Sequence, residues 1–200
     1  MKTLLLATHN AHKVEEFRAI LASLAKDTGK DYHVLSFRDV PDIPEVEETG
    51  TTFAANALLK AEAGAKSGYI TIADDSGLSV DALGGAPGIF SARYAGGHGD
   101  DEANNKKLLA EMQGKTERGA HYVCAVACVV PDGRHFTVEG TCEGEILTAP
   151  RGSAGFGYDP LFLIPGTGQT FAEMTADEKN ARSHRTVALK RFVEKIQEYL

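Results

Sequence analysis

Several features are scarce in this 200-residue chain, and each absence disfavours a class of protein. The three cysteines, Cys124, Cys128 and Cys142, form no Cys-x-x-Cys pair, so neither a disulfide framework nor a zinc site is favoured. No apolar run reaches the roughly 18 residues of a membrane-spanning helix, and the N-terminus lacks a signal-peptide pattern. We therefore expect a protein of the reducing cytoplasm with no membrane partner.

The chain also has no excess of positive charge. It contains 21 Lys and Arg residues and 28 Asp and Glu residues, which gives a formal net charge of −7. A surface that coats nucleic acid would be basic, so no nucleic-acid partner is expected. A small phosphorylated ligand is compatible with this charge, since it needs only a few local donors. The chain lacks the GxxxxGK[ST] pattern as well, which argues against the P-loop folds.

Hydrophobic periodicity predicts an α/β fold with a mixed sheet. The predicted strands are residues 4–7, 33–37, 70–75 and 161–164, with a hairpin formed by 121–130 and 135–141. The predicted helices are residues 14–29, 53–66 and 101–112, with a last helix that follows Ser183. Residues 39–50 should be an irregular loop, and both faces of strand 121–130 are apolar. No repeat or linker divides the chain, so we expect one domain over residues 1–200.

The most informative stretch is a β-branched run that ends in two adjacent carboxylates, Asp74 and Asp75. A break at Ser76-Gly77 would place both at the carboxyl end of a strand, where open α/β sheets bind ligands. Two charges in a poorly solvated place need a cation or hydrogen bonds to compensate them. The alternative is a solvated turn in which an Asp caps the backbone.

Residues 8–13 connect the first strand to the first helix, and such a junction favours an anion through its N–H groups and helix dipole. Lys13, in the first helical turn, is unfavourable against that dipole unless a phosphate neutralises it. The alternative is a solvated lysine beside an ordinary helix cap.

Lys60 lies four residues after Asn56, so both project from one helix face. That face either points at a ligand or is the solvent-exposed side of the helix, and without further evidence the solvent-exposed side is expected. The acidic run 45–48 could add a third carboxylate near Asp74 or Asp75, since Mg²⁺ uses carboxylates together with substrate phosphates. The alternative is a solvated acidic loop.

A glycine-rich strap, residues 151–160, carries Phe156 and Tyr158. An aromatic ring beside flexible glycines suits base stacking, although both rings could equally be core residues. At the start of the last helix, His184 and Arg185 could donate to a purine 6-oxo group and would face a donor in adenine. The alternative there is a helix start in water.

Together these motifs resemble one family. They are ATHNAHK (7–13), EETG (47–50), NALLKA (56–61), ADDSGLSVDALGGAPGIFSARYAG (73–96), FGYDPLF (156–162) and EK…SHR (178–185). Over nearly the whole chain they look like the inosine/xanthosine triphosphate pyrophosphatases, the Ham1-like family. The resemblance implies a homodimer whose long mixed sheet is flanked by helices, with the cleft between two lobes. It implies Mg²⁺-dependent hydrolysis of ITP, dITP and XTP to the monophosphate and pyrophosphate, which clears non-standard purines.

The resemblance also implies roles for residues. Glu48 and Asp75 would bind Mg²⁺, and Asp75 would also accept the proton of the attacking water. The implied substrate contacts are Thr8, His9, Asn10, Ala11, His12, Lys13, Lys60, Ser76, Phe156, Gly157, Tyr158, Asp159, Lys179, His184 and Arg185. One departure from the family pattern is His9, which stands where members often carry glycine.

Two rival functions stay open. One is a pyrophosphatase of the septum-inhibitor type that acts on modified pyrimidine or 7-methylated nucleotides, against which the SHR tail and the FGYDP strap argue. The other is a nucleotide-sensing module, which would bind without hydrolysis and need no carboxylate pair. The sequence also leaves open whether Asp74 shares the metal or only polarises Asp75.

Overall fold

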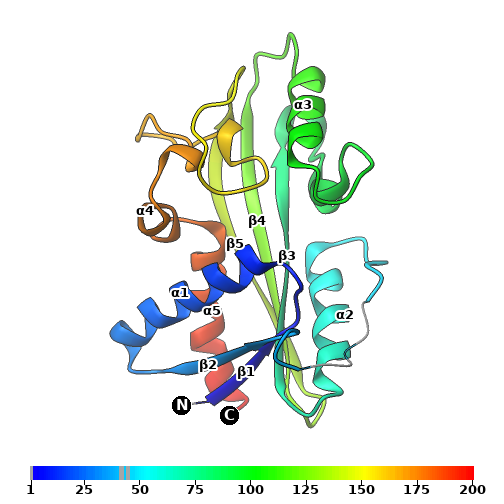
Figure 1. Cartoon of the computed structure of the whole chain (residues 1–200), viewed down its shortest axis with the longest axis vertical. Helices are drawn as coiled ribbons and strands as arrows, with labels where there is room; N and C mark the ends of the chain where they lie inside the picture. The colour runs from blue at the N-terminus through cyan, green and yellow to red at the C-terminus, as the bar shows by residue number, and fades with distance from the viewer. Residues whose placement is uncertain (1, 41–42, 44–45) are drawn as a thin grey trace. The chain divides into compact units, whose positions relative to one another are not determined.

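The structure is a computed structural model that describes residues 2–40, 43 and 46–200 (Figure 1). Its strands are β1 (Lys2–Leu6), β2 (Tyr32–Ser36), β3 (Ile70–Val80), β4 (Gly119–Val129), β5 (His135–Ile146) and β6 (Phe162–Leu163). They form one sheet in the order β2-β1-β3-β4-β5-β6. β1 is parallel to β2 and to β3, whereas β6 is antiparallel to β5. The predicted α/β class with a mixed sheet is confirmed.

The helices are α1 (Ala11–Thr28), α2 (Phe53–Ala65), α3 (Asp101–Glu111), α4 (Ala176–Asn180) and α5 (His184–Lys195). Local sequence explains their ends: Asn10 caps α1, Gly29 ends it with a φ of 69°, and Thr52 caps α2. The capping box of Thr175 and Glu178 is present at the start of α4. In the part of the chain that the structure describes, no helix has the length and apolarity to span a membrane.

The chain forms two compact units. The first contains the N-terminal residues up to Asp75, together with 124–140 and 185–200, and the second contains 76–123 and 141–184. Strands β3, β4 and β5 each continue along the chain from one unit into the other. The expectation of a single domain with two lobes stays a prediction.

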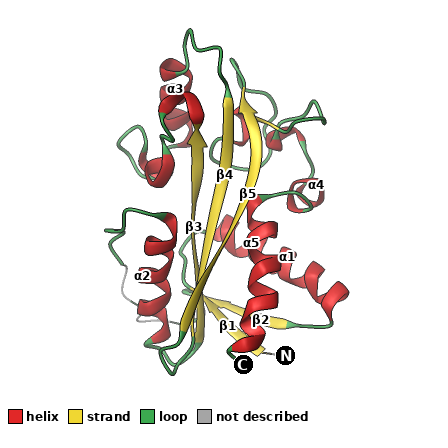
Figure 2. Ribbon diagram, turned by 180° about the vertical axis from the view of Figure 1, so that it is seen from behind, coloured by secondary structure: helices red, strands yellow, loops and turns green. Residues whose placement is uncertain are grey.

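In the first unit, helices cover both faces of the sheet, with α1 and α5 on one face and α2 on the other (Figure 2). Large apolar residues fill the α1/α5 side, including Phe17, Phe192 and Ile72. Alanines such as Ala57, Ala61 and Ala73 fill the α2 side, which lets that helix approach the sheet closely. The apolar residues of β4 within this unit are buried on both sides, as predicted. The second unit has its own core, in which Leu108 of α3 and Met112, the residue after that helix, pack with Leu78 and Phe162.

Two predicted strand ends are wrong. The strand that carries Asp74 and Asp75 does not end at Ser76-Gly77, because β3 continues to Val80. Leu78 and Val80 are fully buried and continue the apolar pattern, so core packing outweighs the weak strand preference of glycine. Strand 161–164 shrinks to β6, since Asp159–Leu161 forms a 3₁₀ turn.

The predicted loop 39–50 is described only in part. Residues 39, 40, 43 and 46–50 belong to no helix or strand, in agreement with the prediction. Pro41, Asp42, Pro44 and Glu45 lie outside the described residues.

Candidate active site

Asp74 and Asp75 are neighbours in β3, so their side chains point to opposite faces of the sheet. Ile72, two residues before Asp74, packs in the core beneath α1 and α5, whereas Ala73, two residues before Asp75, packs against α2. Both carboxylates are buried, with exposures of 1% and 7%. They lie in mid-strand within buried surroundings, so the solvated-turn alternative is wrong.

Asp74 belongs to a buried charge cluster on the α1/α5 face. Its Oδ2 lies 2.9 Å from Lys13 Nζ and 3.6 Å from Arg185 Nε. Arg185 also binds Glu16 through Nη1 and Oε2 at 2.6 Å. Burial alone would raise the pKa of Asp74, but the nearby cations, Lys13 foremost, hold this pKa well below its usual range. Lys13 is therefore neutralised by a carboxylate, and the solvated-lysine alternative is wrong.

Asp75 belongs to a second cluster, formed with α2 and the loop before it. Asn56 Nδ2 donates to Asp75 Oδ2 at 3.2 Å. Lys60 Nζ lies 2.6 Å from Glu48 Oε1 and 3.9 Å from Asp75 Oδ1. Asn56 is fully buried, and its Oδ1 accepts from Gly50 N at 2.7 Å. The alternative that this helix face is exposed to solvent is therefore wrong, because Asn56 and Lys60 both point at the carboxylates.

The protonation of this second cluster follows from its charges. Burial raises the pKa of Asp75, and although Lys60 opposes the rise, Glu48 adds to it. Burial would lower the pKa of Lys60, but the surrounding carboxylates raise it above its usual value. Lys60 is thus an ammonium at neutral pH, and Asp75 is a stronger base than an ordinary carboxylate.

Glu48 and Asp75 face one cation, the Lys60 ammonium, and this donor set suits a metal ion. Within residues 2–40, 43 and 46–200, no group of three or more His, Cys, Asp or Glu residues has a metal-binding arrangement. Two carboxylates are nevertheless what Mg²⁺ uses when substrate phosphates complete its coordination. Glu48 supplies the carboxylate expected from the acidic run, and Glu45 lies outside the described residues.

The predicted phosphate loop is ordered by its own polar residues. Thr8 Oγ1 accepts from Asn10 N at 3.2 Å, and Asn10 Oδ1 accepts from Lys13 N at 3.2 Å. His9, Ala11 and His12 are exposed at the start of α1. The His9 ring lies 4.8 Å from the Phe37 ring, which gives this departure from the family pattern a packing partner.

A third cluster lies in the second unit, around the carboxylate of Asp159. Lys179 Nζ lies 2.7 Å from Asp159 Oδ2, and the side chains of both are almost completely buried. The same Nζ lies 4.7 Å from the centroid of the half-buried Phe156 ring. Tyr122 Oη donates to Asp159 Oδ1 at 3.3 Å, and the His184 ring stacks on Tyr122 with centroids 4.8 Å apart. The cluster thus joins an aromatic ring to a donor and an acceptor.

Other predicted contacts are placed differently. Tyr158 is buried, and its Oη donates to Ser91 O at 2.7 Å, so its ring packs in the core as the alternative had it. Ser76 is half-buried in β3 at the start of the second unit.

His184 and Arg185 do not act as one pair. His184 joins the aromatic cluster of the second unit, whereas Arg185 is held by Glu16 and Asp74 in the first. Successive helical residues point about 100° apart, so adjacent side chains reach different partners. The expectation that Arg185 reads a purine base is not supported by this placement.

The sequence reasoning missed two residues of these clusters, Glu16 and Tyr122. It placed Asn56 on the helix face of Lys60 through their spacing of four but gave Asn56 no role in the site. No sequence signal marked Glu16 and Tyr122, because their partners Arg185 and Asp159 lie 169 and 37 residues away.

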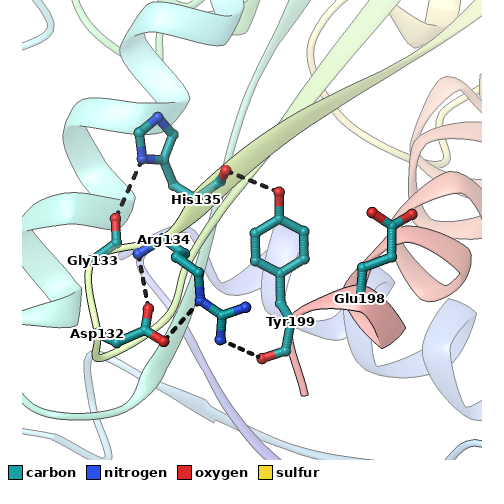
Figure 3. A pocket seen from close by; sticks show the side chains of 6 residues that line it. All are labelled: Asp132, Gly133, Arg134, His135, Glu198 and Tyr199. Carbon is teal, nitrogen blue, oxygen red and sulfur yellow. Dashed lines mark hydrogen bonds and ion pairs between the residues drawn. The ribbon is translucent and has the colours of Figure 1, made fainter.

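A separate hollow of about 620 Å³ lies in the first unit, at the β4–β5 turn and the C-terminal residues (Figure 3). None of the predicted site residues lines it. Its Arg134 Nε donates to Asp132 Oδ2 at 2.8 Å, and Nη2 donates to Tyr199 O at 3.3 Å. The guanidinium is therefore already engaged within the protein.

Comparison with known proteins places the chain in a family. A sequence model described as the Ham1 family matches residues 4–195. The chain belongs to the Ham1 family. A relative from Streptomyces avermitilis named dITP/XTP pyrophosphatase is 51% identical over 100% of both chains. One of the same name from Bacillus subtilis is 49% identical over 96% of each.

Solved Ham1 structures have the same fold. The Ham1 protein of Staphylococcus aureus is 40% identical with a TM-score of 0.86, covering 100% of both chains. A HAM1 protein from Coxiella burnetii is 36% identical with a TM-score of 0.87, covering 99% of this chain and 100% of the other. The resemblance to this family and its fold is confirmed.

Proposed function

We propose that this Ham1-family chain is a nucleoside-triphosphate pyrophosphatase that hydrolyses dITP, ITP and XTP to the monophosphate and pyrophosphate. The observation that carries the proposal is Asp75, a buried carboxylate of raised pKa that Asn56 orients beside Glu48 and Lys60. The relatives named dITP/XTP pyrophosphatase support the same activity. It would clear non-standard purines from the nucleotide pool.

Asp75 acts as the general base. A carboxylate oxygen of Asp75 takes the proton of a water that attacks the α-phosphorus, and the bond to the bridging oxygen of the pyrophosphate breaks. Asn56 fixes the carboxylate plane, and the Lys60 ammonium stabilises charge on the departing phosphates.

Mg²⁺ fits the carboxylates of Glu48 and Asp75, since both already face a cation. When bound, Mg²⁺ would neutralise phosphate charge and lower the pKa of a coordinated water. The phosphates would be bound by the loop of Thr8, His9, Asn10, Ala11, His12 and Lys13, which opens α1. We assign Arg185 to anchoring Asp74, and Asp74 to holding Lys13 rather than the metal.

The cluster of the second unit binds the base. The Phe156 ring offers a stacking surface beside Lys179, an ammonium that donates hydrogen bonds and accepts none. A purine 6-oxo group accepts from such a donor, whereas the 6-amino group of adenine presents a second donor. Asp159 adds an acceptor at the other end of the Lys179 ion pair, and His184 completes the group.

A product assay tests the function. The protein is incubated with Mg²⁺ and ITP, XTP, dITP, GTP, ATP or modified pyrimidine triphosphates, and the products are identified. Selective pyrophosphate release from ITP, dITP and XTP supports the proposal. Activity confined to modified pyrimidines favours the septum-inhibitor type, and tight binding without turnover favours a nucleotide-sensing module. Stepwise release of orthophosphate refutes pyrophosphatase chemistry.

We also propose a homodimer, a cytoplasmic location and a single domain built of two lobes. The dimer rests on the family resemblance. The location rests on the three cysteines, which are free thiols in the structure, two of them buried. Sedimentation equilibrium tests the dimer, and a single cooperative unfolding transition tests the single domain.

A further inference from the structure

The backbone of Gly157, in the strap, is held on both sides by α3. Its N–H donates to Asp101 Oδ2 at 2.7 Å, and its carbonyl oxygen accepts from Asn105 Nδ2 at 2.8 Å. Asp101 and Asn105 are four residues apart, so they project from one helix face. One exposed helix turn thus clamps both hydrogen-bonding groups of a single glycine more than fifty residues away.

The strap is also fixed on the other side of Phe156. Gly155 has a φ of 75°, and a Cβ added there would lie 2.1 Å from Asp159 Oδ2. Phe156 N donates to the same Oδ2 at 3.1 Å. The strap therefore winds closely around the Asp159 carboxylate, and Phe156 sits between this bond and the α3 clamp.

We propose that Asp101 and Asn105 are positioning residues for the substrate base. By holding Gly157 they fix the direction of the Phe156 ring, the surface on which the purine stacks. This inference rests on the proposed function, in which Phe156 and Lys179 bind the base. Neither clamp residue touches the substrate, so losing one weakens base binding and leaves the phosphate chemistry intact.

The amide of Asn105 sets this role apart from ordinary fold stabilisation. Its Oδ1 is buried and accepts no hydrogen bond from the described residues. An unsatisfied buried acceptor costs folding stability. At this position the amide therefore adds little net stability, and what it provides is the bond to Gly157.

The experiment compares two clamp variants with matched controls. Asn105→Ala and Asp101→Ala each remove one bond to Gly157. Asp101→Asn keeps an acceptor oxygen without the charge, and Glu102→Ala removes a charge from the same exposed turn. Phe156→Ala measures the stacking surface itself. For each protein, kcat and KM for ITP, the melting temperature and the affinity for a non-hydrolysable ITP analogue are measured.

We expect Asn105→Ala and Asp101→Ala to raise KM and the analogue Kd by about 5- to 10-fold, the size of one lost hydrogen bond, with kcat within about twofold. Asn105→Ala should melt at or near the parent temperature. Asp101→Asn and Glu102→Ala should bind ITP like the parent. Rescue by Asp101→Asn shows that the acceptor matters rather than the charge.

Parental KM and Kd in both clamp variants, with a raised Kd in Phe156→Ala, overturn the clamp and leave the proposed function standing. A lowered melting temperature with parental Kd also overturns the clamp, since it marks a purely structural contact. An unchanged Kd in Phe156→Ala removes the stacking surface and the inference with it. Absence of pyrophosphate release by the parent refutes the proposed function. The clamp is then still tested by comparing the Kd of the ITP analogue in the clamp variants with that in the parent.

Discussion

Replacing Asp74 by Asn should lower the stability of the protein, whereas replacing Asp75 by Asn should lower its turnover. Asp74→Asn leaves Lys13 and Arg185 in a buried site without their shared counter-charge. Breaking a buried ion pair from one side costs about 3 to 5 kcal/mol. We expect about 3 kcal/mol, the lower end of that range, because Glu16 still binds Arg185 and the Lys13 side chain is 15% exposed.

Asp75→Asn should behave in the reverse way. Its carboxylate carries a raised pKa, so the folded state disfavours its charge and gains from a neutral isostere. We expect unfolding free energy equal to or slightly above that of the parent. Turnover should fall by at least ~100-fold, the usual cost of losing a general base.

Thermal and urea unfolding followed by circular dichroism measure the first effect, and pyrophosphate release from ITP measures the second. In a 200-residue protein, a loss of 3 kcal/mol lowers the melting temperature by about 6 to 12 °C. Activity is compared well below both melting transitions. A parental melting temperature in Asp74→Asn would refute the buried-cluster reasoning, and near-normal turnover in Asp75→Asn would remove Asp75 from its role.

The same contacts support three further predictions. The pKa of Asp74 is lowered in the folded state, so the Asp74 carboxylate contributes to folding stability above about pH 4, and this contribution is lost as the pH falls further. The difference in unfolding free energy between the parent and Asp74→Asn should therefore become smaller in acid, as measured by unfolding curves at several pH values. Lys60→Met should cut kcat for ITP about 10- to 100-fold in steady-state assays while the protein stays folded, and unchanged kcat would exclude Lys60 from the reaction. Removal of Mg²⁺ with EDTA should abolish turnover in the parent, and activity that persists in metal-free buffer would contradict the roles of Glu48 and Asp75 in holding it.

Local signals were sufficient for most of the fold. Helical periodicity placed α2 correctly, whereas α1 begins at Ala11 under the Asn10 cap, three residues before its predicted start at residue 14. A continuous apolar run placed β4 correctly as a strand buried on both faces. The predicted end of β3 was wrong and shows the limit of such signals. Gly77 locally favours the end of a strand, but the burial of Leu78 and Val80 beyond it continues the strand.

The sequence by itself supplied the candidate residues of the site. The order and combination of its motifs marked Asp75, Glu48, Lys60, Lys13, Phe156 and Lys179, whereas a motif taken singly also had an ordinary structural explanation. Spacing alone put Asn56 and Lys60 on one helix face. The family assignment followed from those motifs together, without any coordinates.

Only the tertiary structure decided which of these residues meet. It placed Asp74 beside Lys13 of α1 and Asp75 beside Asn56 of α2, paired Arg185 with Glu16 and Asp74, and set α3 against Gly157. Side-chain partners far apart in the chain depend on how helices pack on the sheet, which no local pattern encodes. The paired carboxylates were visible in the sequence, but their different partners, Lys13 and Arg185 for Asp74 and Asn56 and Lys60 for Asp75, required the fold.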